Sequence, residues 1–430
     1  MKIFNYKTVS EKQLQKLFGR TSIKTEKVGA LVKPIVEDVK KNGDKAMLKY
    51  AKKFDGLLGN SVGTTALELT TAEKKLDTAT KTAINTAAKN IERFHLKQKP
   101  LSYSIETMPG VNCRRKHLPI ENVGLYIPGG SAVLVSTMLM LGIPAKIAGC
   151  KRIIVSSPTQ GNEIHPALAY AAKICGVKEF YKVGGAHAIA MMSYGTKSIK
   201  KVDKILGPGN QFVTTAKTIV SNDPDGCTID MPSGPSEVLI IADEFANPAY
   251  VASDLLAQAE HGTDSQVILL TTSENLALET VKEISKQIKV LPRKELAKQS
   301  INSSFIMIVP TIHEAIKLSN NYAPEHLILN LKNAEKYVSQ ITNAGSVFIG
   351  AFSPESVGDY ASGTNHSLPT YGYAKSIGGV SVESFMKPIT FQKLTRNGLK
   401  KISSTVIQLA ESEKLDAHAN SVRVRLKNGN

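Results

Sequence analysis

Short apolar runs rich in β-branched residues alternate with longer amphipathic segments through most of the chain after residue 120. The runs have the length of strands, and the segments between them repeat apolar residues at helical spacing. This alternation predicts βαβ units, in which helices cover mainly parallel sheets. We expect strands at 123–127, 152–156, 202–206, 237–242, 266–271, 305–309, 327–330 and 346–349, and helices at 166–175, 211–220, 248–261, 274–288, 313–320 and 334–341.

The two ends of the chain carry a different pattern. The first hundred residues are rich in lysine and mostly helical in periodicity, and 71–74 open a long amphipathic stretch. After about residue 385 the pattern is helical again, and it ends in an apparent strand at 422–426. The sequence shows no internal repeats that would mark separate domains, so it leaves the domain boundaries open.

Composition narrows the class of protein. With 430 residues, 42% of them hydrophobic, the chain has enough apolar material for two large cores. Its four cysteines lie far apart and form no metal-binding pair, which is typical of a reducing compartment. The first residues lack the apolar core of a signal peptide, and the longest apolar stretch, 132–145, is too short to span a bilayer. We therefore expect a cytoplasmic protein without membrane contact.

The net charge of +17 raises the alternative of a nucleic-acid-binding protein. However, the lysines are scattered along the whole chain, and no finger, RNA-recognition or basic-zipper pattern accompanies them. A generally basic surface explains the charge without a nucleic acid. Such a surface would also attract an anionic cofactor.

Glycine pairs stand between predicted strands and helices at three places: Gly129-Gly130, Gly184-Gly185 and Gly207-Pro-Gly-Asn210. Backbone N–H groups at the start of a helix can face a phosphate there. The same glycines would also suit ordinary tight turns. The dinucleotide fingerprint G-x-G-x-x-G is absent.

The predicted helix at 248–261 carries polar side chains that point the same way. Asn247 and Pro248 form a typical helix start, and Asp254, Gln258 and His261 follow at a spacing that places them on one face. This face is either solvated or part of a site.

Glu325 and His326 follow Pro324 and directly precede an apolar strand. Neighbouring residues that enter a strand point to opposite faces, so we expect the two to serve different positions instead of bonding to each other. Both side chains suit acid–base chemistry near neutral pH, although a structural pair at the strand entrance is the alternative.

No lysine or arginine occurs between Tyr337 and Ala374, although the chain is strongly basic. This stretch contains Asp359 and His366 and reads as a loop, either an ordinary polar one or one wall of a cation site. Near the C-terminus, Glu413 and His418 add another carboxylate and imidazole. Such nitrogen and oxygen donors suit zinc or a similar divalent ion, with a position left for substrate.

Six motifs occur together and in order, and together they resemble the histidinol dehydrogenase family over residues from about 25 to Val422. They are Gly124-Leu-Tyr-Ile-Pro-Gly-Gly130, Gly207-Pro-Gly-Asn210, Asp230-Met-Pro-Ser-Gly-Pro-Ser236-Glu, Gln258-Ala-Glu-His261-Gly, Pro324-Glu-His326 and Gly358-Asp-Tyr-Ala-Ser-Gly-Thr-Asn-His366. The resemblance implies oxidation of L-histidinol through an aldehyde to L-histidine, with two NAD reduced in succession. This is the last step of histidine biosynthesis.

The same resemblance implies roles for individual residues. His326 would be the base that takes the alcohol proton, and Glu325 would activate the water that adds to the aldehyde. The implied zinc ligands, which also meet the substrate, are Gln258, His261, Asp359 and His418; further substrate contacts are Ser236, His326 and Glu413; and the NAD contacts are Tyr126, His187 and Asn210. His187 departs from the glutamine usual in the family, so we expect a weaker or pH-dependent hold on NAD.

For the fold, the resemblance implies two related, incomplete Rossmann-like doubly wound α/β domains with small helical segments at both ends, in an intertwined homodimer. The expected division is an N-terminal helical arm (1–24), a larger metal and substrate domain (25–125 and 236–380), a second domain for NAD (126–235) and a C-terminal dimerisation segment (381–430). In the dimer, Glu413 and His418 would reach the partner's site. The alternative enzyme class is a zinc hydrolase that uses Glu325-activated water without NAD.

Overall fold

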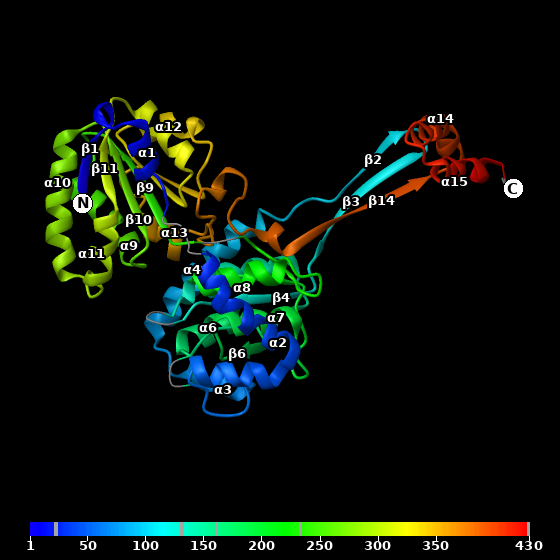
Figure 1. Ribbon diagram of the computed structural model, residues 1–430, viewed down its shortest axis with the longest axis horizontal. Coiled ribbons are helices and arrows are strands. Elements are labelled where there is room, and N and C mark those ends of the chain that lie inside the picture. The colour runs from blue at the N-terminus through cyan, green and yellow to red at the C-terminus, as the bar shows by residue number, and fades with distance from the viewer. Residues whose placement is uncertain (21–24, 130–132, 160–161, 232–233, 428–430) are drawn as a thin grey trace.

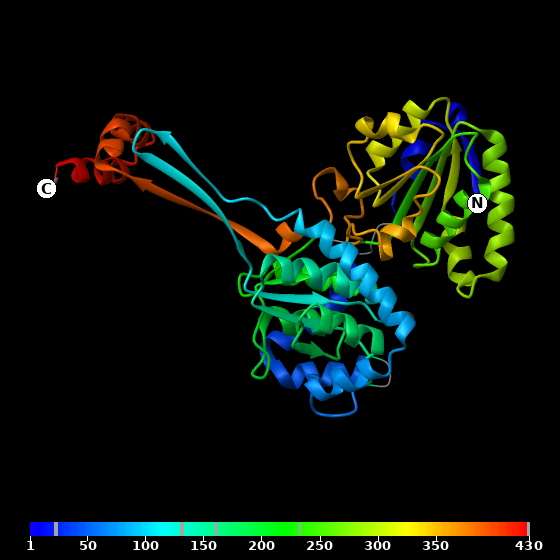
Figure 2. The same cartoon turned by 180° about the vertical axis from the view of Figure 1, so that it is seen from behind.

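The computed structural model describes residues 1–20, 25–129, 133–159, 162–231 and 234–427. Gly130 of the first glycine pair, residues 21–24 of the predicted N-terminal arm, and residues 232–233 within the Asp230–Ser236 motif lie outside these ranges. The chain forms two α/β units and a long arm that ends in two helices (Figures 1 and 2). We call these parts the sheet A unit, the sheet B unit and the arm.

The sheet A unit is built on six parallel strands in the order β1-β11-β10-β9-β12-β13. Side chains of the central strand β9 alternate between two cores, so that Val238 and Ile240 face one layer of helices while Leu239 and Ile241 face the other. The strands are β1 (Lys2–Asn5), β9 (Glu237–Ala242), β10 (Gln266–Thr271), β11 (Phe305–Ile308), β12 (His326–Asn330) and β13 (Ser346–Ile349); the helices are α1 (Glu11–Leu17), α9 (Pro248–Ala259), α10 (Glu274–Gln287), α11 (Lys294–Ser303), α12 (Ile312–Tyr322) and α13 (Glu355–Tyr360), and 3₁₀ turns are η1 (Tyr6–Thr8), η2 (Ile288–Val290), η3 (Ala334–Gln340) and η4 (Tyr373–Lys375).

The sheet B unit has five parallel strands in the order β6-β5-β4-β7-β8. Its two faces are again covered by separate cores, one with α3, α4, α5 and α6 and the other with α2, α7 and α8. The strands are β4 (Asn122–Tyr126), β5 (Arg152–Ser156), β6 (Glu179–Tyr181), β7 (Lys204–Leu206) and β8 (Thr228–Ile229); the helices are α2 (Thr25–Phe54), α3 (Ala66–Lys74), α4 (Thr78–Leu96), α5 (Val135–Ala148), α6 (Pro166–Ile174), α7 (Gly185–Tyr194) and α8 (Gln211–Ser221).

Two of the predicted domain boundaries are wrong. The segment 25–125 was expected with 236–380, but α2 packs on α7 and α8, α3 packs on α6, and α4 packs on α5, all in the sheet B unit. The residues before 21 were expected as a helical arm, but β1 pairs with β11 and extends sheet A. The apolar residues of β1 gain burial at this edge, which helical periodicity alone does not reveal.

The arm is an antiparallel sheet in the order β14-β3-β2, and the helices α14 and α15 lie at the end of this sheet that is distant from the two α/β units. Its strands are β2 (Tyr103–Met108), β3 (Val111–Pro119) and β14 (Met386–Leu394), its helices are α14 (Arg396–Ser412) and α15 (Asp416–Lys427), and η5 (Val382–Phe385) leads into it. The strand predicted at 422–426 is wrong, because these residues lie inside α15, which packs on α14. The strand β14, in turn, lies where helical periodicity was expected.

The fold class predicted from the alternation is confirmed: two parallel, doubly wound α/β units form the body of the chain. Among the residues that the structure describes, no helix combines the length and the apolarity that crossing a bilayer requires. The four cysteines, Cys113, Cys150, Cys175 and Cys227, are all free thiols.

Candidate active site

The predicted chemical residues of the sheet A unit meet at the amino ends of its strands. His326 begins β12, Glu237 begins β9, and Gln258 lies in the last turn of α9, before β10. Ligand sites of open α/β sheets usually lie at the carboxyl ends instead. The segment after α13 leads from this edge to the sheet B unit, where the Asn90 side chain donates to the carbonyl of Ala361 (2.9 Å).

Helix α9 delivers Gln258 and His261 to this edge. The Asn247 side chain accepts from the N–H of Ala249 (2.8 Å) and caps the start of the helix, which has Pro248 at its first position. The helix ends at Ala259, two residues before the predicted end, so His261 stands just beyond it. The buried carboxamide of Gln258 lies between Glu355 and the Glu237 N–H, and these neighbours assign its orientation: the nitrogen donates to the Glu355 carboxylate and the oxygen accepts from the Glu237 N–H.

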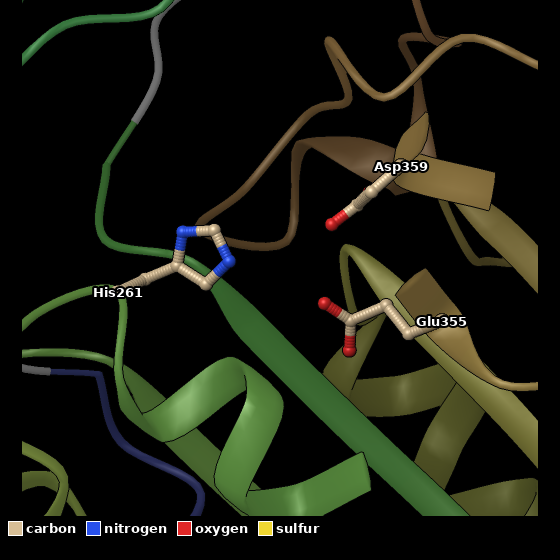
Figure 3. Close-up of side chains that lie close together, drawn as sticks. All are labelled: His261, Glu355 and Asp359. Atoms are coloured by element: carbon tan, nitrogen blue, oxygen red, sulfur yellow. The ribbon is translucent and has the colours of Figure 1, made fainter. Parts of the chain in front are cut away.

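Figure 3 shows His261, Glu355 and Asp359 pointing toward one another. One potential ligand atom from each lies within 4.8 Å of the others. Glu355 is buried, and its Oε2 has no hydrogen-bond partner. A buried carboxylate oxygen without a partner is costly unless a cation or another donor meets it. The donor set therefore fits a divalent ion such as zinc.

Burial strongly perturbs the acids of this cluster. It raises the pKa of Glu355 to about 8, and the carboxylates of Asp359 and Glu325 add to the effect while His326 opposes it. Burial also raises the pKa of Asp254, on the same face of α9, to about 7. The pKa of His261 is lowered by lost hydration, although its side chain stays exposed and Asp359 works against the shift. We attribute this crowding of carboxylates to a site built for a cation.

His326 is held in one orientation by backbone. Its Nδ1 lies 3.1 Å from the carbonyl oxygen of Glu237, and because a carbonyl can only accept, Nδ1 carries the proton. The other nitrogen, Nε2, lies 3.6 Å from Asp359 Oδ1 and has no hydrogen-bond partner. Burial lowers the pKa of His326, but Glu355, Glu325 and Asp359 outweigh it and hold the pKa well above its usual value.

Glu325 shares the same backbone support. One of its carboxylate oxygens accepts from the N–H of Glu237 (2.9 Å), and the side chain is buried. Burial raises its pKa to about 8, against the attraction of His326. Glu325 Oε2 lies 3.6 Å from His326 Nδ1, beyond hydrogen-bond length, as expected for residues that serve different positions.

The predicted cofactor residues gather at the carboxyl ends of the sheet B strands. The phenol oxygen of Tyr126 accepts from the N–H of Gly185 (3.0 Å), and burial raises the pKa of Tyr126 to about 12. His187 is buried and its Nε2 meets Asp55 at 2.8 Å, while Asp55 also accepts from the N–H of Gly184 (3.0 Å). Next to these residues lies a cavity of about 390 Å³, lined by Phe54, Asp55, Gly129, Val133, Pro158, Thr159, Glu163, Ile164, His165, Pro166 and Leu168.

The Gly-Pro-Gly-Asn210 loop is fixed at the same edge. Gly207 has a φ of +129°, and its N–H donates to Asp230 (2.7 Å) while its carbonyl accepts from Lys217 (2.8 Å). Asn210 is exposed and caps α8 by accepting from the N–H groups of Phe212 and Val213. The glycines thus form a rigid turn that a ligand can approach.

Two predicted site residues lie elsewhere in this chain. Glu413 directly follows α14 and His418 lies in α15, and both helices are at the far end of the arm from α9 and α13 in both views (Figures 1 and 2). Ser236 directly precedes Glu237, next to Glu325. His366, at the loop's far end, bridges the carbonyl of Asp359 (2.9 Å) and the Thr137 hydroxyl of the other unit (3.0 Å).

Sequence reasoning missed Glu355, Asp55 and Glu237. Glu355 is one helical turn before Asp359, so the short helix α13 points both carboxylates the same way. That spacing is a readable signal within the cation-free stretch. Asp55 meets His187 across 132 residues, and Glu237 meets Glu325 and His326 across 88 and 89 residues, so one sequence gives no signal for either.

Comparisons with known proteins agree with this geometry. A family model described as histidinol dehydrogenase matches residues 19–426. The chain belongs to the histidinol dehydrogenase family. A histidinol dehydrogenase of Photobacterium profundum is 48% identical over 99% of this chain and 96% of its own length. The chloroplastic histidinol dehydrogenase of Arabidopsis thaliana is 50% identical over 99% of this chain and 92% of its own.

The fold agrees as closely as the sequence. The crystal structure of histidinol dehydrogenase from Elizabethkingia anophelis superposes with a TM-score of 0.94 and 50% identity, covering 99% of this chain and 98% of that one. The resemblance inferred from the motifs is therefore confirmed, and the chain is an oxidoreductase of the histidinol dehydrogenase family. This membership removes the basis for the hydrolase alternative.

Proposed function

We propose that this protein oxidises L-histidinol to L-histidine through L-histidinaldehyde, in two successive two-electron steps that each use one NAD. The observation that carries the proposal is the joint support of Glu325 and His326 by the backbone of Glu237, beside the cluster of His261, Glu355 and Asp359. His326 as a base for the alcohol and Glu325 as a carboxylate that activates water, both at one cation site, suit an alcohol oxidation followed by an aldehyde oxidation.

His326 serves the first step. In the neutral ring, with Nδ1 held by the Glu237 carbonyl, Nε2 is the nitrogen left to accept a proton from the substrate's hydroxyl, and the raised pKa of His326 shifts this form toward alkaline pH. Its position next to Asp359 keeps the protonated ring stabilised once it has formed.

Glu325 serves the second step. One carboxylate oxygen is fixed by the Glu237 N–H, which leaves the other to take a proton from water that adds to the aldehyde. A pKa near 8 suits this role, because a base works best when its pKa lies near the pH of the reaction. Burial of the site keeps the reactive aldehyde away from bulk solvent.

Gln258, His261 and Asp359 would hold a zinc ion, with Glu355 fixing the carboxamide of Gln258. When bound, the ion supplies an anchor for the imidazole and amine of the substrate. The absence of lysine and arginine from the loop with Asp359 fits this role, because an ammonium group there would compete with the ion. NAD supplies the oxidising power of both steps, and Tyr126, His187 and Asn210 would contact it near the cavity that Phe54 and Asp55 line.

A second copy of the chain would complete the site. Glu413 and His418 stand at the tip of an arm that leaves the body, and its strands expose large apolar side chains such as Ile105 and Phe391. We propose a homodimer in which each arm brings two residues to the partner's site. They are Glu413, which would contact the substrate together with Ser236, and His418, which would be the fourth zinc ligand. A cytoplasmic location remains part of this proposal and rests on the four free cysteines.

The test is the number of NADH molecules formed per molecule of L-histidinol. It is measured by letting a limiting amount of L-histidinol react to completion, with and without a chelator. The proposal requires two NADH per substrate, a loss of activity with chelator and its return with zinc. One NADH per substrate, with aldehyde accumulating in solution, contradicts the second step. Activity that survives complete metal removal contradicts the role of the ion.

A further inference from the structure

Arg20, just after α1, reaches into the sheet A unit and holds Glu237. Its Nε donates to Glu237 Oε1 at 2.5 Å and its Nη2 donates to Oε2 at 2.9 Å, a two-point ion pair. The side chain of Glu237 is only 3% exposed and that of Arg20 17%. A buried carboxylate needs such a partner, and here the partner comes from more than two hundred residues away.

The same guanidinium also holds the chain just before the candidate catalytic pair. Nη2 donates to the carbonyls of Tyr322 (2.8 Å) and Ala323 (3.2 Å), and the group lies 3.9 Å from the centre of the Tyr322 ring. Ala323 has a φ of +53°, in the left-handed region that alanine rarely adopts. Arg20 therefore bridges the start of β9 and the strained turn that leads into β12.

These contacts bear directly on Glu325 and His326. The N–H of Glu237 supports Glu325, and the carbonyl of Glu237 orients His326. The N–H of Tyr371 also donates to the Glu237 carboxylate (2.9 Å), so the side chain is fixed from both sides. If Glu237 turned, both backbone groups would move away from the two side chains that they hold.

We propose that Arg20 is a positioning residue for Glu325 and His326, acting through Glu237 and the turn at 322–323. The inference rests on the proposed function, because it takes the roles of Glu325 and His326 from there. In the described part of the chain Arg20 bonds to Glu237, Tyr322 and Ala323 and to neither of these two side chains, so its effect is on their orientation. Loss of orientation lowers the rate of chemistry more than it lowers the binding of substrate or NAD.

The sheet B unit offers a matched control. Arg152 makes the same two-point pair with Glu179, at 2.7 Å for both contacts, and its Nη1 donates to the carbonyls of Lys200 and Lys201. Its side chain is also 17% exposed. Arg152 begins β5, at the edge of sheet B opposite to the predicted cofactor residues. Arg152→Ala thus removes a similar structural contact without touching the site.

The experiment measures kcat and KM for L-histidinol and NAD in Arg20→Ala, Arg20→Lys and Arg152→Ala, each loaded with zinc. We expect Arg20→Ala to lower kcat at least tenfold with KM changed less than about threefold, and Arg152→Ala to leave both near wild type. Arg20→Lys should recover little, because an ammonium cannot form the two-point pair. Millimolar guanidinium should restore activity to Arg20→Ala and should not raise the activity of wild type.

Two further readings separate the outcomes. NADH formed per histidinol should fall below two in Arg20→Ala, with aldehyde captured by a carbonyl trap, because Glu325 is displaced as well as His326. An unchanged kcat in Arg20→Ala, or an equal loss of kcat in Arg20→Ala and Arg152→Ala, would overturn the inference. The proposed function would still stand if wild type forms two NADH per histidinol. If Arg20→Ala does not accumulate folded, Arg20→Lys decides by the same criteria. A wild type that forms no NADH from histidinol refutes the proposed function itself.

Discussion

At the scale of single residues, the site is assembled against the preferences of its own side chains. Glu325 and Glu355 are both buried among other acids, and burial raises the pKa of each to about 8. Carboxyls prefer to ionise in water, so a chain that holds them in such a place gives up stability for chemistry.

The pH dependence of this cost can be measured with Glu325→Gln. Because the folded pKa of Glu325 is raised from 4.5 to about 8, the native state retains a proton there that the unfolded chain has lost. Stability then falls as the pH rises through that window. Glutamine cannot ionise, so the variant lacks this effect. In metal-free protein we expect its free energy of unfolding to match that of wild type near pH 4.5 and to exceed it near pH 8. The difference should reach up to a few kcal/mol, at about 1.4 kcal/mol for each pKa unit.

Thermal unfolding of both proteins across this pH range tests the expectation. Glu244→Gln, in an exposed turn after β9, is the control and should show no difference that grows with pH. An equal offset of Glu325→Gln at both pH values would show that the carboxyl ionises normally in the fold.

Glu355 has a separate prediction, because under the proposed function it orients Gln258, a proposed zinc ligand, and does not bind substrate. Above a pH of about 8, where Glu355 is ionised, Glu355→Gln removes the charge that fixes the carboxamide of Gln258, and we expect zinc affinity there to fall about 10- to 100-fold. Competition for zinc with a fluorescent chelator measures it, with Glu260→Gln, beside His261, as the neighbouring control. Unchanged zinc affinity would show that Gln258 is positioned by the Glu237 N–H alone.

At the scale of elements, sequence patterns predicted the interior better than the edges. The strands β9, β10 and β11 are buried on both faces, so their continuous apolar runs were readable. The run Val422–Leu426 alternates apolar and basic residues like a strand, yet it belongs to α15, which packs on α14 and in which Val422 is buried. In β14 most residues are exposed, so the sequence lacks the apolar signal on which strand prediction depends.

The site followed the same division. Helical spacing placed Gln258 with His261, and strand entry separated Glu325 from His326, because both depend only on local geometry. Glu237 and Arg20 could not be found, since their role comes from a contact between segments that are distant in sequence. The notion that His187 weakens the hold on NAD stays a prediction; the structure adds that its ring is occupied by Asp55.

The joint between the arm's hairpin and its helices gives a prediction at this scale. A Cβ added to Gly398 would collide with the carbonyl oxygen of Gly110, at the turn between β2 and β3. Gly398→Ala should therefore loosen α14 and α15 from the strands while the body stays folded. Hydrogen exchange should rise in α14 and α15 only, whereas Gly378→Ala, where a Cβ meets open space, should change nothing. Protection equal to wild type in α14 would show that the turn yields without cost.

At the scale of the whole molecule, the predicted cofactor residues and the predicted metal residues lie on different α/β units. Sheet B offers its carboxyl edge and sheet A its amino edge, and the loop from Asp359 to His366 joins them. The arm carries the remaining predicted site residues away from both units (Figure 2). A single copy is therefore incomplete under the proposed function.

Mixing two inactive variants tests this directly. His326→Ala lacks a base in the body, and His418→Ala lacks the ligand on the arm. If arms exchange between copies, a mixed dimer contains one intact site, and refolding the two together should restore roughly a quarter of wild-type activity. Each variant refolded alone should stay inactive. No recovery in proven mixed dimers would place His418 in its own chain's site.

The pairing of β1 with β11 has a consequence for how the chain is made. The strands of sheet B and helices α2 to α8 are made before β9, with the hairpin of β2 and β3 between them, so most of that unit can fold before sheet A is complete. The strand β1 is synthesised before the sheet B unit but finds its partner only after Phe305 has been made. This early segment is thus placed late, and Arg20, which follows it, is placed with it. Translation must pass most of its length before the acids of the site receive the support that orders them.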